Sequence, residues 1–217
     1  MPMCVNLVRA GHVVVAHDLR TELQAPVSAS GARWASTAAE AAAVADVLIT
    51  MLPGPNEVAE AMVGAGGALG AMRRGSTWID TSSNASALAE PIRALAGERG
   101  VDVLDAPVGG GVVAAQDATL AFYVGGSAEV LDRHRGVFDA LGDPRRLVHV
   151  GGPGTGYTTK LLVNLLWFGQ AVATAEALLL GKRAGIDLGV LRGALADSAA
   201  ATVSSAAISM PCSPGTT

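Results

Sequence analysis

The stretch DVLITMLPGPNEVAEAMV, residues 46–63, decides the fold class of this 217-residue chain. Its first part is an almost continuous apolar run, which predicts a strand over 46–53 that is covered on both faces, as strands of parallel sheets are. Apolar residues at helical spacing follow and predict a helix over 57–63. A strand followed directly by a helix is the repeating unit of a parallel sheet with helices on its faces.

The same alternation continues on both sides of this stretch. Before it, the pattern predicts the end of a helix, a turn at Gly11, strands at 13–15 and 32–34, and a helix over 36–44. After it, the pattern predicts strands at 76–80, 101–108, 119–126 and 146–151 and helices at 87–100 and 127–141. Strands that alternate with helices are typical of a doubly wound α/β domain.

The segment GGPGTG, residues 151–156, predicts the end of this domain, because Gly and Pro break both periodic patterns there. We expect a first domain over 1–151 and the start of a helical domain over 152–199, with helices at 156–184 and 187–199. Residues 200–217 contain Pro211, Pro214 and Gly215 and have little to bury, so they predict a disordered tail.

Composition narrows the class of function. The chain is 50% hydrophobic and 16% charged, which suits a globular protein with a buried core. A net charge of -4 without a Lys/Arg cluster gives no electrostatic footprint for nucleic acid or an anionic membrane, so we expect small-molecule partners. Cys4 and Cys212 have no metal-ligand spacing, and no signal-peptide pattern opens the chain, so we expect a cytoplasmic protein without a metal site.

The run over residues 161–181 is long enough to span a membrane. Three polar residues argue against that interpretation: Asn164, Gln170 and Glu176 project from different faces of a helix, and no single face shelters them all. A carboxylate in the middle of a membrane also costs about 2.5–3.5 kcal/mol. We therefore expect a helix that is buried on all sides in a soluble protein, and no membrane partner.

Five separate stretches resemble one family, the β-hydroxyacid dehydrogenases, typified by 3-hydroxyisobutyrate dehydrogenase and related to 6-phosphogluconate dehydrogenase. The stretches are PMCVNLVRAGHVVVAHD (2–18), VLITMLP (47–53), WIDTSSNA (78–85), DAPVGGGVVAAQDATLAFYVGG (105–126) and GTGYTTKLLVN (154–164). They are similar to the family's motifs and follow the family's order from residue 2 to about 199. The resemblance implies a doubly wound Rossmann-like NAD(P)-binding domain whose first strand is missing, followed by a truncated all-helical domain.

Family members begin with a strand and a G-x-G-x-x-G loop, and MPMCVNL matches the residues directly after that loop. We therefore expect the chain to be a fragment, or the product of a gene model with a late start and an altered end. The resemblance implies that the full-length form is a homo-oligomer. The segment GAGGALG at 64–70 does not replace the loop, because it follows a helical stretch and not a strand. The segment at 151–156 precedes a helix and could offer backbone N–H groups to an anion.

Asp18 bears on the choice of cofactor. It follows the first predicted strand of the chain, where a carboxylate accepts hydrogen bonds from the adenosine ribose and favours NAD. Arg20 could instead hold the 2′-phosphate of NADP. NAD is the expected cofactor and NADP the alternative, while a solvated charge at a strand end is the interpretation without function.

Two further segments are implied as cofactor contacts. Met51, Leu52 and Pro53 end a parallel strand, where the ligands of such sheets collect. Ser82 and Ser83 are similar to the family's pair of hydroxyl residues near the nicotinamide ribose, and Ser83 stands where the family usually has Thr.

Lys160 is the candidate catalytic residue. Oxidation of a hydroxyacid needs a base for the hydroxyl proton, and a partly desolvated lysine can have its pKa lowered toward that use. Asn164 lies one helical turn further and could hydrogen-bond the same substrate. Val163 replaces the first Asn of the family's K-x-x-N-N pattern. Without the resemblance, Lys160 would be interpreted as an ordinary exposed lysine.

The loop implied to bind substrate departs from the family's D-A-P-V-S-G-G, because Gly109 stands at the place of the serine and Gly110 and Gly111 follow it. Their backbone N–H groups could still bind a carboxylate. The implied reaction is hydride transfer between a nicotinamide cofactor and a small β-hydroxyacid or the corresponding semialdehyde. The alternative is a truncated non-catalytic remnant or an interaction module that keeps part of the fold.

Overall fold

The computed structural model describes residues 1–198 and residue 200. Contacts within the chain divide it into two compact units, Met1–Leu161 and Leu162–Thr217. This division falls ten residues after the boundary that the sequence analysis places at residue 151. The tail expected over 200–217 lies outside the described residues except for Ala200.

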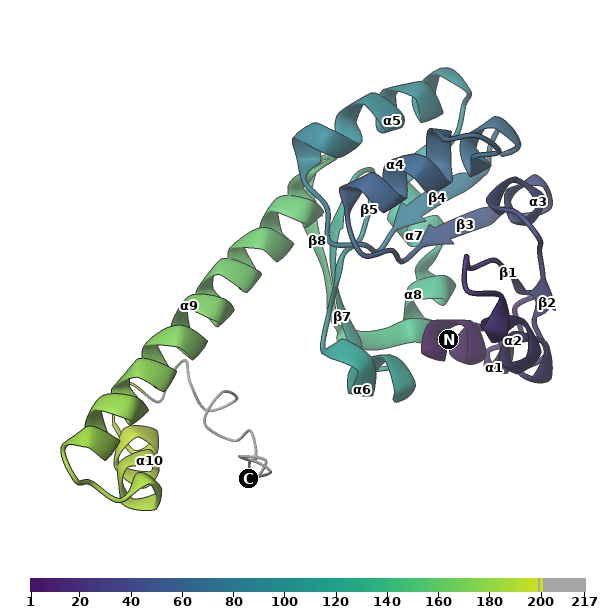
Figure 1. The fold of residues 1–217 in the computed structure, drawn as a ribbon. Helices are drawn as coiled ribbons and strands as arrows, with labels where there is room; N and C mark the ends of the chain where they lie inside the picture. The colour runs from purple at the N-terminus through teal and green to yellow at the C-terminus, as the bar shows by residue number, and fades with distance from the viewer. Residues whose placement is uncertain (199, 201–217) are drawn as a thin grey trace. The chain divides into compact units, whose positions relative to one another are not determined.

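The first unit alternates strands and helices, as predicted (Figure 1). Its strands are β1 (Val15–Ala16), β2 (Arg33–Trp34), β3 (Val47–Thr50), β4 (Thr77–Asp80), β5 (Asp102–Asp105), β6 (Val108–Gly109), β7 (Leu120–Gly125) and β8 (Gly142–Gly151). Its helices are α1 (Pro2–Arg9), α2 (Gln24–Ala29), α3 (Ala38–Ala43), α4 (Pro55–Val63), α5 (Ser86–Glu98), α6 (Gly111–Gln116), α7 (Ala128–Arg133) and α8 (Arg135–Leu141). Helix α9 (Thr155–Arg183) begins in this unit.

The strands form two sheets. β1 and β2 make a parallel pair, and six strands make a second sheet in the order β3-β4-β5-β7-β6, with β8 paired to β7. β3, β4 and β5 are parallel, so their carboxyl ends lie at one edge. β7 runs antiparallel to β5 and β6 and parallel to β8. The α/β class and the Rossmann-like arrangement followed by a helical segment are thereby confirmed.

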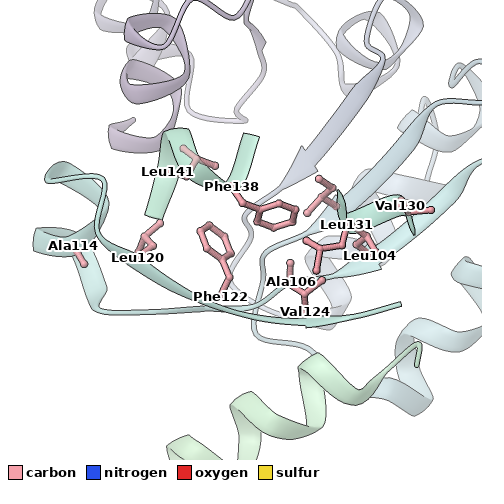
Figure 2. Close-up of a cluster of buried hydrophobic side chains, with 11 residues drawn as sticks. Leu104, Ala106, Ala114, Leu120, Phe122, Val124, Val130, Leu131, Phe138 and Leu141 are labelled. Atoms are coloured by element: carbon pink, nitrogen blue, oxygen red, sulfur yellow. The ribbon is translucent and has the colours of Figure 1, made fainter. Parts of the chain in front are cut away.

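Two hydrophobic clusters use opposite faces of the larger sheet. Trp78 packs with residues of α4 and α5, whereas its neighbour Ile79 packs with residues of α6, α7 and α8, because successive side chains of a strand point to opposite faces. Figure 2 shows the second cluster, in which the rings of Phe122 and Phe138 meet edge to face with centroids 5.1 Å apart. Both faces of the central strands are therefore covered.

Two strands at the edges of the sheets are shorter than the sequence predicts. β1 covers Val15–Ala16 and not 13–15, and Val13 is 98% exposed, because β1 pairs over only two residues. The strand predicted over 46–53 is limited to Val47–Thr50. Its apolar residues Val47, Leu48 and Ile49 are half-buried rather than fully covered, because β3 pairs only with β4 among the described residues.

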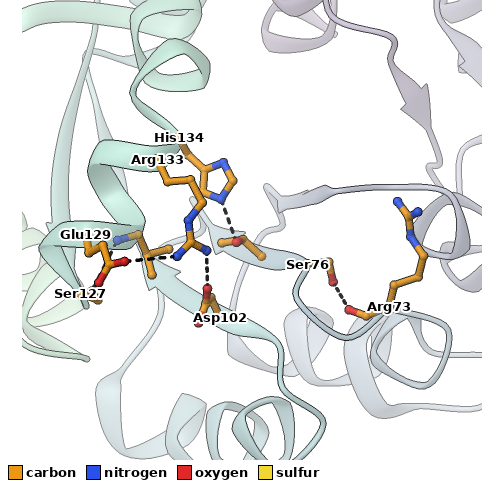
Figure 3. A network of polar contacts seen from close by, with 9 residues as sticks. Arg73, Ser76, Asp102, Ser127, Glu129, Arg133 and His134 are labelled. Carbon is orange, nitrogen blue, oxygen red and sulfur yellow. Dashed lines mark hydrogen bonds and ion pairs between the residues drawn. The ribbon is translucent and has the colours of Figure 1, made fainter.

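The helix predicted over 127–141 is two helices, α7 and α8, separated at His134. His134 leaves the helical conformation, with φ -107° and ψ 17°, and its Nε2 lies 2.8 Å from Thr77 Oγ1 at the start of β4. Arg133 beside it donates to Asp102 over 2.7 Å and lies 3.9 Å from Glu129 (Figure 3). The break thus lets the end of α7 bind to the amino ends of β4 and β5.

The strand predicted over 101–108 is also divided, into β5 and β6. Pro107 lies between them and has no N–H for a strand ladder, so regular pairing is interrupted there.

The second unit holds most of α9 and helix α10 (Leu188–Ala196), whose first turn is capped by Asp187 through the N–H of Val190 at 3.0 Å. The expectation that α9 is buried on all sides is wrong, since Leu165 and Leu166 are 68% and 64% exposed. A helix is buried only where other elements pack against it. Among the described residues of this unit, α10 packs against α9 at Gly181. Within the described residues, α9 alone is long and apolar enough to cross a membrane, which is weak evidence by itself.

Candidate functional site

The carboxyl edge of β3, β4 and β5 brings together two segments predicted to contact a cofactor. Leu52, after β3, donates its backbone N–H to the hydroxyl of Ser82, after β4, over 2.9 Å. Ser82 is fully buried, while Ser83 is exposed and Met51 is 55% exposed. The Ser82 hydroxyl therefore joins the two loops, and Met51, Pro53 and Ser83 are the accessible members of the predicted set.

Asp80 ends β4 at this edge with none of its surface exposed. Its Oδ1 accepts from the Thr50 hydroxyl at 2.8 Å and from the Ser82 N–H at 3.0 Å. Its Oδ2 accepts from the Tyr157 hydroxyl at 2.8 Å and from the Asn84 amide at 3.3 Å. These four bonds satisfy a carboxylate that would otherwise be costly to bury.

Asp105 ends β5 directly opposite Asp80 in the register and is 1% exposed. Its Oδ1 accepts from the N–H of Gly154 at 2.7 Å, and its Oδ2 accepts from the N–H of Tyr157 at 3.2 Å. The N–H of Gly156 lies near this carboxylate and favours its charged form. Burial raises the pKa of Asp105, although the backbone N–H bonds act in the opposite direction.

Tyr157 joins the two aspartates to the first turn of α9. The side chain is 1% exposed, its hydroxyl binds Asp80 and its N–H binds Asp105. Burial, with the nearby Asp80 charge, raises the pKa of Tyr157 far above its ordinary value, so the hydroxyl stays protonated as a donor. Sequence analysis missed all three residues.

Lys160 lies three residues after Tyr157 on α9 and is half-buried. Burial lowers the pKa of its ammonium. Among the described residues, no hydrogen-bond or ion-pair partner holds this amine. A partly desolvated lysine without a counter-charge has the properties that a proton acceptor needs.

Asn164 lies one turn further along α9 and is half-buried, but it belongs to the second unit. Its predicted partnership with Lys160 stays a prediction.

The two candidates at the end of β1 bind each other. Arg20 donates its N–H and Nε–H to Asp18 Oδ1 at 2.9 and 3.0 Å, and its Nη2 donates to Oδ2 at 2.8 Å. Hydrogen bonding from Arg20 lowers the pKa of Asp18 to about 2, so the carboxylate is charged at neutral pH. Sequence analysis treated the two side chains as competitors, whereas the structure makes them one ion pair.

The predicted substrate loop lies where β6 leads into α6. Gly109 pairs with Ala121 in the sheet, and Gly110 and Gly111 have φ angles of 111° and 67°. A side chain at Gly110 would be strained by this φ and would clash with the Ala114 methyl group. The two glycines therefore give a backbone turn that another residue type would not readily adopt.

A surface cavity of about 440 Å³ lies elsewhere, between α4, α5 and the loop that contains GAGGALG. Its lining residues include Met62, Leu69, Leu95 and Arg99 and none of the predicted site residues. The chemistry therefore gathers at the carboxyl edge of the sheet and not in this cavity.

Sequence analysis had one signal for the two missed aspartates. Asp80 and Asp105 are charged residues at the last positions of two apolar strands, where a parallel sheet collects functional groups. Both stood in the motifs WIDTSSNA and DAPVGGG, but only the hydroxyl and glycine residues of those motifs received a role.

Two family models match the chain. The NAD binding domain of 6-phosphogluconate dehydrogenase matches residues 1–152. A model described as NAD-binding of NADP-dependent 3-hydroxyisobutyrate dehydrogenase matches residues 154–211.

Curated relatives and solved structures agree with these matches. An NAD-dependent L-serine dehydrogenase and a 3-hydroxyisobutyrate dehydrogenase, both from Pseudomonas aeruginosa, are 38% and 37% identical to the chain over 190 residues. Each alignment covers 88% of the chain and 63% of the relative, so the chain spans less than two thirds of their length. The structure of Mycobacterium tuberculosis 3-hydroxyisobutyrate dehydrogenase with L-serine is 36% identical, with a TM-score of 0.83 over 92% of this chain and 67% of that one.

Proposed function

The chain belongs to the β-hydroxyacid dehydrogenase family, and on this premise we propose that it contributes the nucleotide-binding domain and the catalytic lysine of an NAD(P)-dependent oxidoreductase. The observation that carries this proposal is the half-buried amine of Lys160, which has a lowered pKa and no partner among the described residues, next to the first turn of α9 at the carboxyl edge of the sheet. That edge is where doubly wound sheets bind their ligands.

We propose a small β-hydroxyacid, or its semialdehyde, as the substrate. The two P. aeruginosa relatives are named for L-serine and 3-hydroxyisobutyrate, which both carry a hydroxymethyl group on the carbon next to a carboxylate. The turn at Gly110 and Gly111 offers backbone N–H groups for that carboxylate.

The described residues fit a nicotinamide dinucleotide at two places. The charged Asp18 at the end of β1 suits the adenosine ribose, and the accessible Met51 and Ser83 lie on loops at the carboxyl edge of the larger sheet. When bound, the dinucleotide supplies the hydride acceptor. Lys160 Nζ, in its neutral form, accepts the hydroxyl proton as the substrate carbon loses its hydride, and we propose that Asn164 orients the substrate.

We propose that the active form is a cytoplasmic homo-oligomer. Membership of a family of small-molecule dehydrogenases supports this placement, and the net charge of -4 gives no basis for nucleic acid as a partner.

A full-length chimera tests the proposal. The M. tuberculosis relative supplies the parts of the protein that this chain does not cover, and reduced cofactor is measured with L-serine or 3-hydroxyisobutyrate and with NAD or NADP. We expect turnover that needs both the hydroxyacid and the cofactor. A folded chimera that binds cofactor but oxidises neither acid would contradict the proposal and favour the non-catalytic alternative.

Cofactor preference gives a further prediction. In the chimera, Asp18→Ala should lower the ratio of kcat/KM for NAD to that for NADP. The substitution removes the ribose acceptor and a negative charge, and it releases Arg20 to bind a 2′-phosphate. Asp46→Ala is the matched control, because Asp46 also pairs with an arginine, Arg73, but lies before β3 and away from the carboxyl edge. An unchanged ratio in Asp18→Ala would make the Asp18–Arg20 pair a solvated strand end without a role in specificity.

A further inference from the structure

Asp105 acts as a cap for α9 although it lies in a different element. The first N–H groups of a helix have no partner within the helix and need one from elsewhere. Asp105 accepts from the N–H of Gly154 just before α9 and from the N–H of Tyr157 in its first turn. A carboxylate at a helix amino end also interacts favourably with the helix dipole. The start of α9 is therefore bound to the end of β5.

The backbone of α9 approaches the sheet so closely that only glycine fits. A Cβ atom at Gly156 would clash with the carbonyl oxygens of Asp105 and Tyr123. A Cβ atom at Gly125 would lie 2.5 Å from Asp105 Oδ2 and 2.8 Å from the nitrogen of Gly156. The carboxylate bonds are therefore part of a direct backbone contact between the sheet and α9.

Asp80 adds a second attachment one strand away, through the Tyr157 hydroxyl. Tyr157 and Lys160 are three residues apart on α9, so they project from the same side of the helix. Tyr157, which is bound to both aspartates, and Lys160 therefore share one helix face. A rotation or shift of the first turn of α9 would move the Lys160 amine.

We propose that Asp80 and Asp105, acting through the side chain of Tyr157 and the N–H groups of Gly154 and Tyr157, are positioning residues that hold the Lys160 amine in its half-buried place at the carboxyl edge. We name these two carboxylates the aspartate clamp. The purpose of the clamp rests on the proposed function, in which Lys160 is the base. The hydrogen bonds of the clamp form within this chain and do not depend on which reaction it takes part in.

The chain offers a direct readout, because Lys160 and Lys182 are its only lysines. Competitive acetylation with isotope-labelled acetic anhydride across a pH series, followed by mass spectrometry, gives the titration midpoint of each amine in the intact chain. Lys182 is exposed near the end of α9 and serves as the internal reference. In the unsubstituted chain we expect the Lys160 midpoint below the ordinary lysine value, since burial lowers its pKa.

Two substitutions weaken the clamp to different degrees. Tyr157→Phe removes only the hydroxyl that reaches Asp80. Asp105→Asn replaces one carboxylate oxygen with an NH2 donor, so the side chain can no longer accept from both the Gly154 and the Tyr157 N–H groups. We expect the Lys160 midpoint to rise toward the ordinary value by at least ~0.5 pH unit in each variant, because the amine becomes more hydrated. The Lys182 midpoint should not move.

Thr50→Val is the control for a general loss of stability. It removes the buried hydrogen bond to Asp80 Oδ1, the oxygen that does not bind Tyr157, and the bond from the Trp78 indole, and both lost bonds join β3 to β4. We expect it to lower the melting temperature without moving the Lys160 midpoint. An unmoved Lys160 midpoint in Tyr157→Phe and Asp105→Asn, each shown by near-ultraviolet circular dichroism to be folded, would overturn the proposal, and so would an equal shift in Thr50→Val.

The labelling requires no turnover, so its result is separate from the proposed function. In the chimera, Tyr157→Phe should lower kcat and move the rise of the pH–rate profile to higher pH, with the KM for cofactor unchanged. A chimera without dehydrogenase activity would contradict the proposed function and leave the labelling result as the test of the clamp.

Discussion

Replacing Lys160 with alanine in the full-length chimera lowers kcat by about 10²–10⁴-fold, the usual contribution of a general acid–base group. The Kd for NAD(H) stays nearly constant, because the lysine acts on the substrate hydroxyl and not on the dinucleotide. In the parent, kcat should rise with pH and level off, since the neutral amine is the active form and burial lowers its pKa. Steady-state and single-turnover rates, with added small amines to restore the missing base, measure the effect.

Two control substitutions accompany Lys160→Ala. Asn164→Ala should lose about tenfold, because one neutral hydrogen bond contributes roughly 0.5–1.5 kcal/mol. Lys182→Ala, which removes the exposed lysine near the end of the same helix, should leave kcat unchanged. If Lys160→Ala keeps more than about a tenth of the parent rate, the effect falls below the range of a general base and Lys160 is an ordinary lysine.

Extending the chain at its N-terminus with the first strand and glycine loop of the M. tuberculosis relative should tighten NAD(H) binding at least ~100-fold. In a doubly wound sheet the first strand lies between the strands that correspond to β1 and β3. The carbonyls of Val14, just before β1, and of Ala16 accept from the N–H groups of Arg33 and Ala35 on the β2 side, so the backbone N–H and C=O of Val15 point to the other edge. The carbonyls of Asp46, just before β3, and of Thr50 accept from the N–H groups of Thr77 and Thr81 on the β4 side. The backbone N–H and C=O groups of Val47 and Ile49 therefore point away from β4, toward the place of the added strand.

The added loop supplies backbone N–H groups for the pyrophosphate, each worth about 1.5–3 kcal/mol when the acceptor is charged. Two such bonds account for the ~100-fold difference. Calorimetric titration compares the chain, the extended chain and an extended chain with valine in place of the loop glycines. We expect tight binding only in the extended chain with its glycines, and equal dissociation constants for all three would refute the assignment of the dinucleotide site.

The order of strands and helices could be predicted because the spacing of apolar residues along the chain differs between strands and helices. The ends of the elements could not, since they depend on neighbours. β1 is short because its pairing extends over two residues, and Val47, Leu48 and Ile49 are half-buried because β3 has one partner among the described residues. The apolar pattern of α9 likewise predicts burial, but burial also needs a covering surface.

The candidate site was predictable where one short motif contains the chemistry, as with Lys160 and the glycine turn. It was not predictable where the function of a residue depends on distant parts of the chain. The bond from Tyr157 to Asp80 joins residues 77 positions apart, and that from Gly154 to Asp105 joins residues 49 apart. Asp18 and Arg20 show a third case, because both were identified but only the structure shows that they bind each other.

Transfer of a labelled hydride shows whether the chain takes part in the proposed reaction. The full-length chimera is incubated with NAD or NADP and a β-hydroxyacid that carries deuterium on the carbon bearing the hydroxyl, and the reduced nicotinamide is analysed by mass spectrometry, for the parent and for Lys160→Ala. We expect one deuterium on the nicotinamide and the semialdehyde as product with the parent, and a rate at least ~10²-fold lower without Lys160. Nicotinamide without deuterium, or equal rates for the two proteins, would contradict this expectation.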